Sequence, residues 1–256
     1  MSKLLKESKK KKSNLSDQRL DYPCCMYKIK SDTNIYAGSI YPDTFDKIKT
    51  SCLYLPVYMP KQNVRIPFEF ESSRNIIDKV ILYETTINPD LSNCYVYLTV
   101  DVRPIKYMKS QRSSKWHIEQ IQDEGYIGDA GRTYIVVDKF GPIYIPLKSN
   151  FIEYLPVSDV STFIDQTEQY GKKMSEDGIN EIDAYQLYCF DQMYMIKDRV
   201  NYFGSEINRK YVKITISKSK FNRSHHSFNM MFKYENWPKI THQHKGTLNQ
   251  CHFNLE

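Results

Sequence analysis

Alternation of apolar and polar residues predicts short β-strands through most of residues 24–155. The clearest strand is the run 64–70, where Val64, Ile66, Phe68 and Phe70 alternate with Arg65, Pro67 and Glu69, and Pro67 places it at a sheet edge. A second is the run 94–103, where Val96, Leu98 and Val100 share one face and tyrosines lie on the other. Further runs of this kind are residues 26–30, 52–59, 79–84, 132–138, 142–147, 210–217 and 227–234. Parallel strands need long crossover connections, and this stretch has none before residue 155. We therefore expect a largely antiparallel sheet.

The pattern changes to a helical period after residue 158. Asp159 can cap a short helix that ends near Gly171. A longer stripe indicates a late helix over 179–203, ending at Gly204. The apolar residues of this stripe are spaced three or four apart: Ile182, Tyr185, Cys189, Met193, Ile196, Val200 and Phe203.

These elements predict an α+β fold that is mainly β. We expect a basic N-terminal helical arm over 1–21, one antiparallel β-sandwich domain over 22–235, and an extended C-terminal tail over 236–256. The sandwich carries the helices near 159–171 and 179–203. A chain of 256 residues is long enough to bury a core without disulfide or metal support.

The N-terminal arm combines a lysine run with a few leucines. It has three interpretations: a solvated segment, a nuclear-import or phosphate-binding tail, or an arm ordered by packing on a neighbouring subunit. We prefer the last, because so few leucines cannot stabilise an isolated helix. The expected assembly residues are Leu4, Leu5, Lys9, Lys10, Lys11, Lys12, Leu15 and Leu20.

Charge and cysteine content narrow the class of protein. The formal net charge is +6, and most of that excess lies in the first twelve residues, so the body is close to neutral. We therefore do not expect nucleic acid as a partner. No apolar run is long enough to cross a membrane, and residues 1–20 lack the apolar core of a signal peptide. We expect an intracellular protein whose six cysteines are free thiols.

Motifs for catalysis, phosphate binding or metal binding are weak. The glycines of GYIGDAG at 125–131 are followed by no helix and have Asp129 among them, so a turn is the better interpretation. The tail histidines His242, His244 and His252, with Cys251, have ligand chemistry but little rigid frame. We assign no catalytic residue, no metal site and no required cofactor.

Tyrosine is unusually abundant, with 21 residues. Tyrosine fills half-buried sheet surface well, and it is also a favoured contact residue between proteins. Its phenol ionises near pH 10, so alkali would charge any contact rich in tyrosine. If such contacts hold a self-assembled lattice together, replacing tyrosines on the polar strand faces, such as Tyr95 or Tyr97, by phenylalanine should raise the pH at which that lattice dissolves. The candidates for this alkaline switch are Tyr95, Tyr97, Tyr185, Tyr188, Tyr194 and Tyr202.

Four segments carry a resemblance to a known family. The segments VYLTVDVRPIKYM at 96–108, SKWHIEQI at 114–121, RTYIVVDKFGPIYIPL at 132–147 and IDAYQLYCFDQMYMIKDRVNYF at 182–203 resemble parts of the polyhedrins, the occlusion-body proteins of insect viruses. The cypovirus type is the nearer match because of the late helix. The baculovirus type is the second match, with its strand leading into an Arg-Pro pair and its basic run near the start.

The resemblance implies a structural protein without catalysis. Such a protein forms homotrimers that pack into an intracellular crystal around virus particles and dissolves at alkaline pH. The crystal lies in the cytoplasm of the infected cell, or in the nucleus for the baculovirus type. Bound nucleoside triphosphate is implied by the resemblance alone, and the nucleotide-binding residues stay unassigned.

Two other function classes remain as alternatives. The first is a viral RNA-binding or nucleocapsid-type protein whose lysine arm engages phosphate. Steep loss of RNA affinity with salt would distinguish it from a matrix protein. The second is a metal-dependent enzyme that uses the C-terminal histidines.

Overall fold

The computed structural model describes residues 35–119, 131–147, 160–191, 194–218, 220–221 and 226–234. Contacts divide the chain after Thr33, and every described residue belongs to the unit Asn34–Glu256. The expected arm (1–21), the strand at 26–30 and the tail (236–256) lie outside the described residues. Among the helices that are described, none combines the length and the apolar character needed to cross a bilayer.

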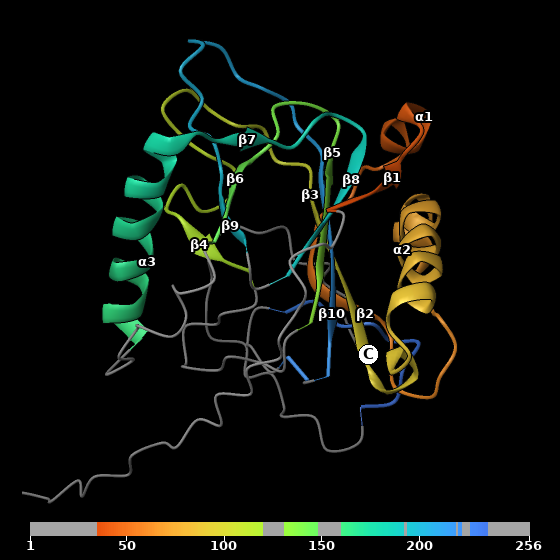
Figure 1. Ribbon diagram of the computed structural model, residues 1–256. Helices are drawn as coiled ribbons and strands as arrows, with labels where there is room; N and C mark the ends of the chain where they lie inside the picture. The colour runs from red at the N-terminus through yellow and green to blue at the C-terminus, as the bar shows by residue number, and fades with distance from the viewer. Residues whose placement is uncertain are drawn as a thin grey trace, which may run out of the picture. The chain divides into compact units, whose positions relative to one another are not determined.

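Two antiparallel sheets form the frame (Figure 1). The larger has six strands in the order β1-β8-β5-β10-β3-β2, and the smaller has four in the order β4-β9-β6-β7. The strands of the larger sheet are β1 Tyr36–Ser39, β2 Cys52–Tyr58, β3 Tyr95–Asp101, β5 Thr133–Val137, β8 Gln186–Phe190 and β10 Tyr211–Ser217. Those of the smaller are β4 His117–Ile118, β6 Ile143–Pro146, β7 Asn180–Glu181 and β9 Tyr194–Lys197. The predicted antiparallel, mixed α+β class is confirmed.

Helices are few. The α-helices are α1 Pro42–Asp46, α2 Arg74–Ile87 and α3 Val160–Met174, and the 3₁₀ turns are η1 Phe68–Ser73, η2 Leu91–Asn93 and η4 Ser175–Asp177. In Figure 1, α2 lies beside the larger sheet and α3 lies beside the smaller one. Helix α3 is anchored where the backbone N–H of Trp116 donates to the Glu168 carboxylate.

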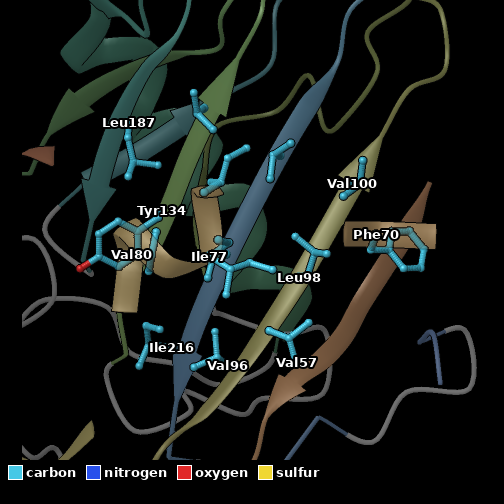
Figure 2. Close-up of a cluster of buried hydrophobic side chains, with 14 of the residues drawn as sticks. Val57, Phe70, Ile77, Val80, Val96, Leu98, Val100, Tyr134, Leu187 and Ile216 are labelled. Atoms are coloured by element: carbon cyan, nitrogen blue, oxygen red, sulfur yellow. The ribbon is translucent and has the colours of Figure 1, made fainter. Parts of the chain in front are cut away.

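The main core lies between α2 and one face of the larger sheet. Figure 2 shows Ile77 and Val80 of α2 among Leu98 and Val100 of β3 and Ile216 of β10. Each of these side chains is at most 1% exposed. The alternation in the sequence of β3 therefore identifies correctly the face that packs on α2, because residues two apart in a strand share a side.

A second core lies between the two sheets. Ile135 and Tyr211 of the larger sheet pack in one cluster with Tyr144 and Ile196 of the smaller sheet. Strands β5, β8 and β10 are buried on both faces. The sequences of β5 and β8 are apolar after their first residue, whereas β10 alternates apolar residues with Lys213, Thr215 and Ser217.

The predicted long helix over 179–203 is wrong. Those residues form β7, β8 and β9, and Tyr185 has a φ of +62°, a value no helix interior adopts. In β8, Leu187 belongs to the first core while Tyr188 and Phe190 belong to the second. A strand buried on both faces can be apolar at consecutive positions. Some of these positions then lie three or four residues apart, so the strand satisfies a helical spacing by coincidence.

Three predicted strands are also corrected. Residues 79–84 lie in α2, whose buried positions Ile76, Ile77, Val80 and Glu84 follow a helical period over a longer window. Neither 64–70 nor 227–234 is a strand, and both instead lie along the exposed edge of β2. The N–H of Arg65 donates to the Val57 carbonyl at 2.8 Å, and that of Ser227 donates to the Leu53 carbonyl at 2.7 Å. These segments cover an edge that would otherwise invite pairing with another chain.

Gly141 marks the closest approach between β6 and the segment leading out of β7. A Cβ built there would lie 1.8 Å from the backbone oxygen of Ile182. We expect Gly141→Ala to lower the free energy of unfolding by about 1–3 kcal/mol, because a backbone neighbour cannot move aside as a side chain can. Urea denaturation measures this change. Gly204→Ala is the comparison, since its Cβ would meet no atom within 4 Å although its φ of +77° strains the backbone. Any loss in Gly204→Ala reports backbone strain alone, and a Gly141→Ala protein as stable as the parent would show that the contact with Ile182 does not limit this position.

Candidate interaction surface

Two loops meet beyond the ends of β3 and β9. One spans residues 102–112 and the other spans residues 198–210. They are joined by an isolated bridge between Ile105 and Ile207. The N–H of Met108 donates to the Asn201 carbonyl at 2.8 Å, and that of Asn201 donates to the Lys109 carbonyl at 2.9 Å. Backbone pairing of this kind makes the two loops one rigid unit.

Asn201 holds the turn of the second loop. Its side chain is fully buried, and its amide donates to the carbonyls of Ile105 at 3.0 Å and Ser205 at 2.6 Å. Its side-chain oxygen accepts the N–H of Phe203 at 2.9 Å. This is the local bonding that makes asparagine a turn residue, and Gly204 completes the turn with a positive φ.

A buried ion pair anchors both loops beneath the surface. The Arg209 guanidinium is fully buried and donates two hydrogen bonds to the Asp198 carboxylate, at 2.7 and 2.8 Å. A third goes from its Nε to the Gln111 side-chain oxygen at 2.6 Å. The same carboxylate accepts the N–H of Arg112 at 2.7 Å. Each loop thus contributes charged or polar groups to one shared network.

The surface above this network is apolar and aromatic. Tyr107, Met108, Tyr202 and Phe203, which we call the aromatic platform, are 55%, 54%, 68% and 69% exposed. Exposed apolar side chains scattered singly need no explanation, whereas a group of four on a rigid support is typical of an interaction site. The basic residues Lys106 and Lys109 flank Tyr107 and Met108 in the first loop, and both are exposed.

An acidic segment lies next to the platform. Residues 175–183, which we call the acidic turn, contain Glu176, Asp177, Glu181 and Asp183 and no Lys or Arg. Arg199 of the second loop forms an ion pair with Glu181, and its guanidinium carbon lies 4.3 Å from the centroid of the Phe140 ring. The Phe140 ring meets that of Phe203 at 5.8 Å between centroids. In Figure 1, β7 and the chain after β9 accordingly lie together at one end of the smaller sheet.

A second charged cluster is buried on the polar face of the larger sheet. The Lys213 ammonium donates to the Glu119 carboxylate at 2.8 Å and to the Tyr54 hydroxyl at 2.9 Å. Burial alone would raise the pKa of Glu119, but Lys213 and His117 outweigh it and lower that pKa. Burial would lower the pKa of Lys213, but Glu119 raises it. Both groups therefore stay charged near neutral pH: the lowered pKa makes the Glu119 carboxylate a weak base, and the raised pKa keeps Lys213 an ammonium rather than a nucleophilic amine.

The candidate tyrosines do not form one group. Tyr202 belongs to the aromatic platform. Tyr97 was expected on an outer face but is only 1% exposed, and its ring stacks on Phe221 at 4.3 Å. Tyr188 is also buried, and Tyr95, Tyr185 and Tyr194 are half-buried. The polar face of β3 is thus an interior face, which alternation alone cannot show.

The expected assembly-arm residues, the tail histidines and Cys251 lie outside the described residues. In the part of the chain that is described, no three His, Cys, Asp or Glu side chains come together as a metal site. Cys94 and Cys189 are buried free thiols, and the buried Cys52 thiol donates to the Leu98 carbonyl at 3.6 Å.

Sequence reasoning missed the platform and its anchors. Met108, Phe203 and Arg209 carried no motif, and Val200 and Phe203 were assigned to a helix face. The signal that was present is Asn201 three residues before Gly204, a pairing typical of a turn.

Compared with known proteins, the chain matches no family model and no curated protein.

Proposed function

We propose that this protein is a structural protein that self-assembles into an intracellular matrix, as its resemblance to the polyhedrins implies. The observation that carries the proposal is the aromatic platform, four exposed apolar side chains on loops held by the buried Arg209–Asp198 pair. Rigid support matters because a preordered surface loses little conformational entropy on association.

The finer features of the proposal follow the same resemblance. The matrix encloses virus particles in the cytoplasm of an infected insect cell, is built from homotrimers, and needs neither catalysis nor a cofactor. The two antiparallel sheets with a shared core suit the β-sandwich of that family, with residues 1–21 as an assembly arm and 236–256 as a tail. Alkali releases the particles.

Expression of the full chain in insect cells tests the proposal. We expect dense crystalline bodies by electron microscopy, and their loss when residues 1–20 are deleted, with the truncated protein still folded by circular dichroism. A full-length protein that stays monomeric over a wide concentration range, with no bodies in the cells, would contradict self-assembly. Undiminished bodies from the truncated chain would contradict the role of the arm alone.

Single-stranded RNA binding is the second candidate. Lys106 and Lys109 flank Tyr107, and rings on a basic loop can stack on bases. A fluorescence titration of labelled RNA at several salt concentrations measures it. Affinity that falls steeply with salt would indicate contacts to several phosphates.

A further inference from the structure

We propose that the face formed by the aromatic platform and the acidic turn is a two-fold contact between two copies of this chain. The inference rests on the proposed function, since it names the surface and the partner through which self-assembly begins. It depends on three properties of this face: its charge pattern, the order of its parts and its rigid apolar centre.

The charges of the two parts are opposite. Residues 103–109 contain Arg103, Lys106 and Lys109 and no acidic residue, whereas the acidic turn contains four carboxylates and no basic residue. Arg103 is already bonded to Asp101, so Lys106 and Lys109 are the cations offered outward. Glu206 adds one carboxylate to the platform side, and the exposed Lys173 at the end of α3 adds one cation beside the acidic turn, while its neighbour Lys172 is bonded to Glu168. Within the turn, Glu181 is paired with Arg199 and Asp183 accepts the Tyr188 hydroxyl. Glu176 and Asp177 are exposed, so the turn still has the opposite sign of charge from Lys106 and Lys109.

The two parts lie side by side, which allows a two-fold arrangement. The Arg199–Glu181 ion pair and the Phe140–Phe203 ring contact join them within one copy. A two-fold rotation about an axis between the parts places the basic platform of each copy on the acidic turn of the other. The same complementary contact then occurs twice, as in any isologous interface.

The centre of the face has the composition of a protein contact. Tyrosine, phenylalanine and methionine are enriched in interfaces, and Ile179 of the acidic turn, at 53% exposed, adds an aliphatic side chain. The charges around this centre would select the partner and its orientation more than they would add affinity. A nucleic acid fits less well, because the carboxylates of the acidic turn would repel its phosphates.

A two-fold contact by itself closes at a dimer. Combined with the trimer that the polyhedrin resemblance implies, it would link each trimer to its neighbours, and such links extend an array. The contact is thus one of at least two that the proposed matrix requires.

Charge reversal in the full-length chain tests the contact. One variant carries Lys106→Glu and Lys109→Glu, and the other carries Glu176→Lys and Asp177→Lys. Sedimentation velocity over a concentration series measures self-association. We expect each variant alone to associate at least tenfold more weakly than the parent, because like charges then meet at both halves of the interface. An equimolar mixture should associate again, since each platform then meets a complementary turn.

Two further variants complete the design. Tyr202→Ser with Phe203→Ser should weaken association without altering any charge. Lys47→Glu with Lys49→Glu changes the same number of exposed lysines on the segment between α1 and β2 and should leave association unchanged. Circular dichroism confirms that every variant is folded, and thermal unfolding should match the parent.

The outcomes separate the inference from the proposed function. A parent chain that never associates contradicts both. A parent that associates while the platform and turn variants associate equally well overturns the two-fold contact and leaves self-assembly standing. Variants that lose RNA binding while keeping full association would assign the platform to nucleic acid and likewise overturn the inference.

Discussion

Asp198→Asn should lower the free energy of unfolding by about 3–5 kcal/mol, a large part of the stability of a typical domain. The change keeps the shape of the side chain but leaves the buried Arg209 guanidinium without its counter-charge. The two carboxylate oxygens of Asp198 accept hydrogen bonds from Arg209 and from the Arg112 N–H. The substitution also replaces one of these oxygens by an amide NH₂ group, which can only donate. Because Arg209 lies under both loops, hydrogen exchange should rise across residues 102–112 and 198–210 together.

The matched control is Glu71→Gln in the exposed ion pair with Arg74, whose side chains are 46% and 42% exposed. Solvent screens such a pair, so its loss should cost about 0–1 kcal/mol. Urea denaturation of the three proteins gives both values. Similar small losses for the two variants would show that the Arg209–Asp198 pair is not what holds the loops.

Alkali should destabilise the fold itself above about pH 10. Burial raises the pKa of Tyr97 and of Tyr211, and burial together with a hydrogen bond to Asp183 raises the pKa of Tyr188 to about 12. A raised pKa means that the folded chain keeps protons that the unfolded chain loses. The stabilisation is complete below pH 10 and declines between about pH 10 and 12, by about 1.4 kcal/mol per pH unit for each such tyrosine.

This result changes the expected alkaline switch. Repulsion between phenolates at contacts requires exposed tyrosines, and Tyr97 is not one of them. Its ionisation must instead accompany opening of the fold. We therefore expect Tyr97→Phe to flatten the dependence of unfolding free energy on pH by about 1.4 kcal/mol per unit above pH 10.

Tyr202→Phe is the comparison, because Tyr202 lies on the exposed platform. It should raise the pH at which assemblies dissolve. Unfolding curves over pH 8 to 12 and light scattering of assemblies measure the two effects separately. Parallel curves for the parent and both variants would favour loss of lysine charge as the cause of dissolution.

Local pattern was sufficient where one face of a strand meets the main core. The alternation of Val96, Leu98 and Val100 located β3 and the side of it that packs on α2. The antiparallel arrangement followed from the short connections before residue 155. The helix expected near 159–171 corresponds to α3, since its one-sided stripe ended at the predicted place within a few residues.

Local pattern failed where burial occurs on both sides or where bonding is long-range. Strand β8 is apolar at every position after Gln186 because two cores enclose it, and no period can then distinguish it from a helix. Residues 64–70 alternate as a strand does, but Ile66 and Phe70 turn inward while Phe68 is 91% exposed. Their conformation is decided by the edge of β2, which they cover.

The sequence by itself determined the antiparallel α+β class, the main strands, the tyrosine-rich composition and the basic start of the chain. Only the tertiary structure decided which tyrosines are interior, which strands are covered twice, and that residues 102–112 and 198–210 form one surface. The physical reason is that Arg209, Asp198, Gln111 and Asn201 acquire their roles through partners far along the chain, as between Gln111 and Arg209. Residue type and spacing do not encode such pairings.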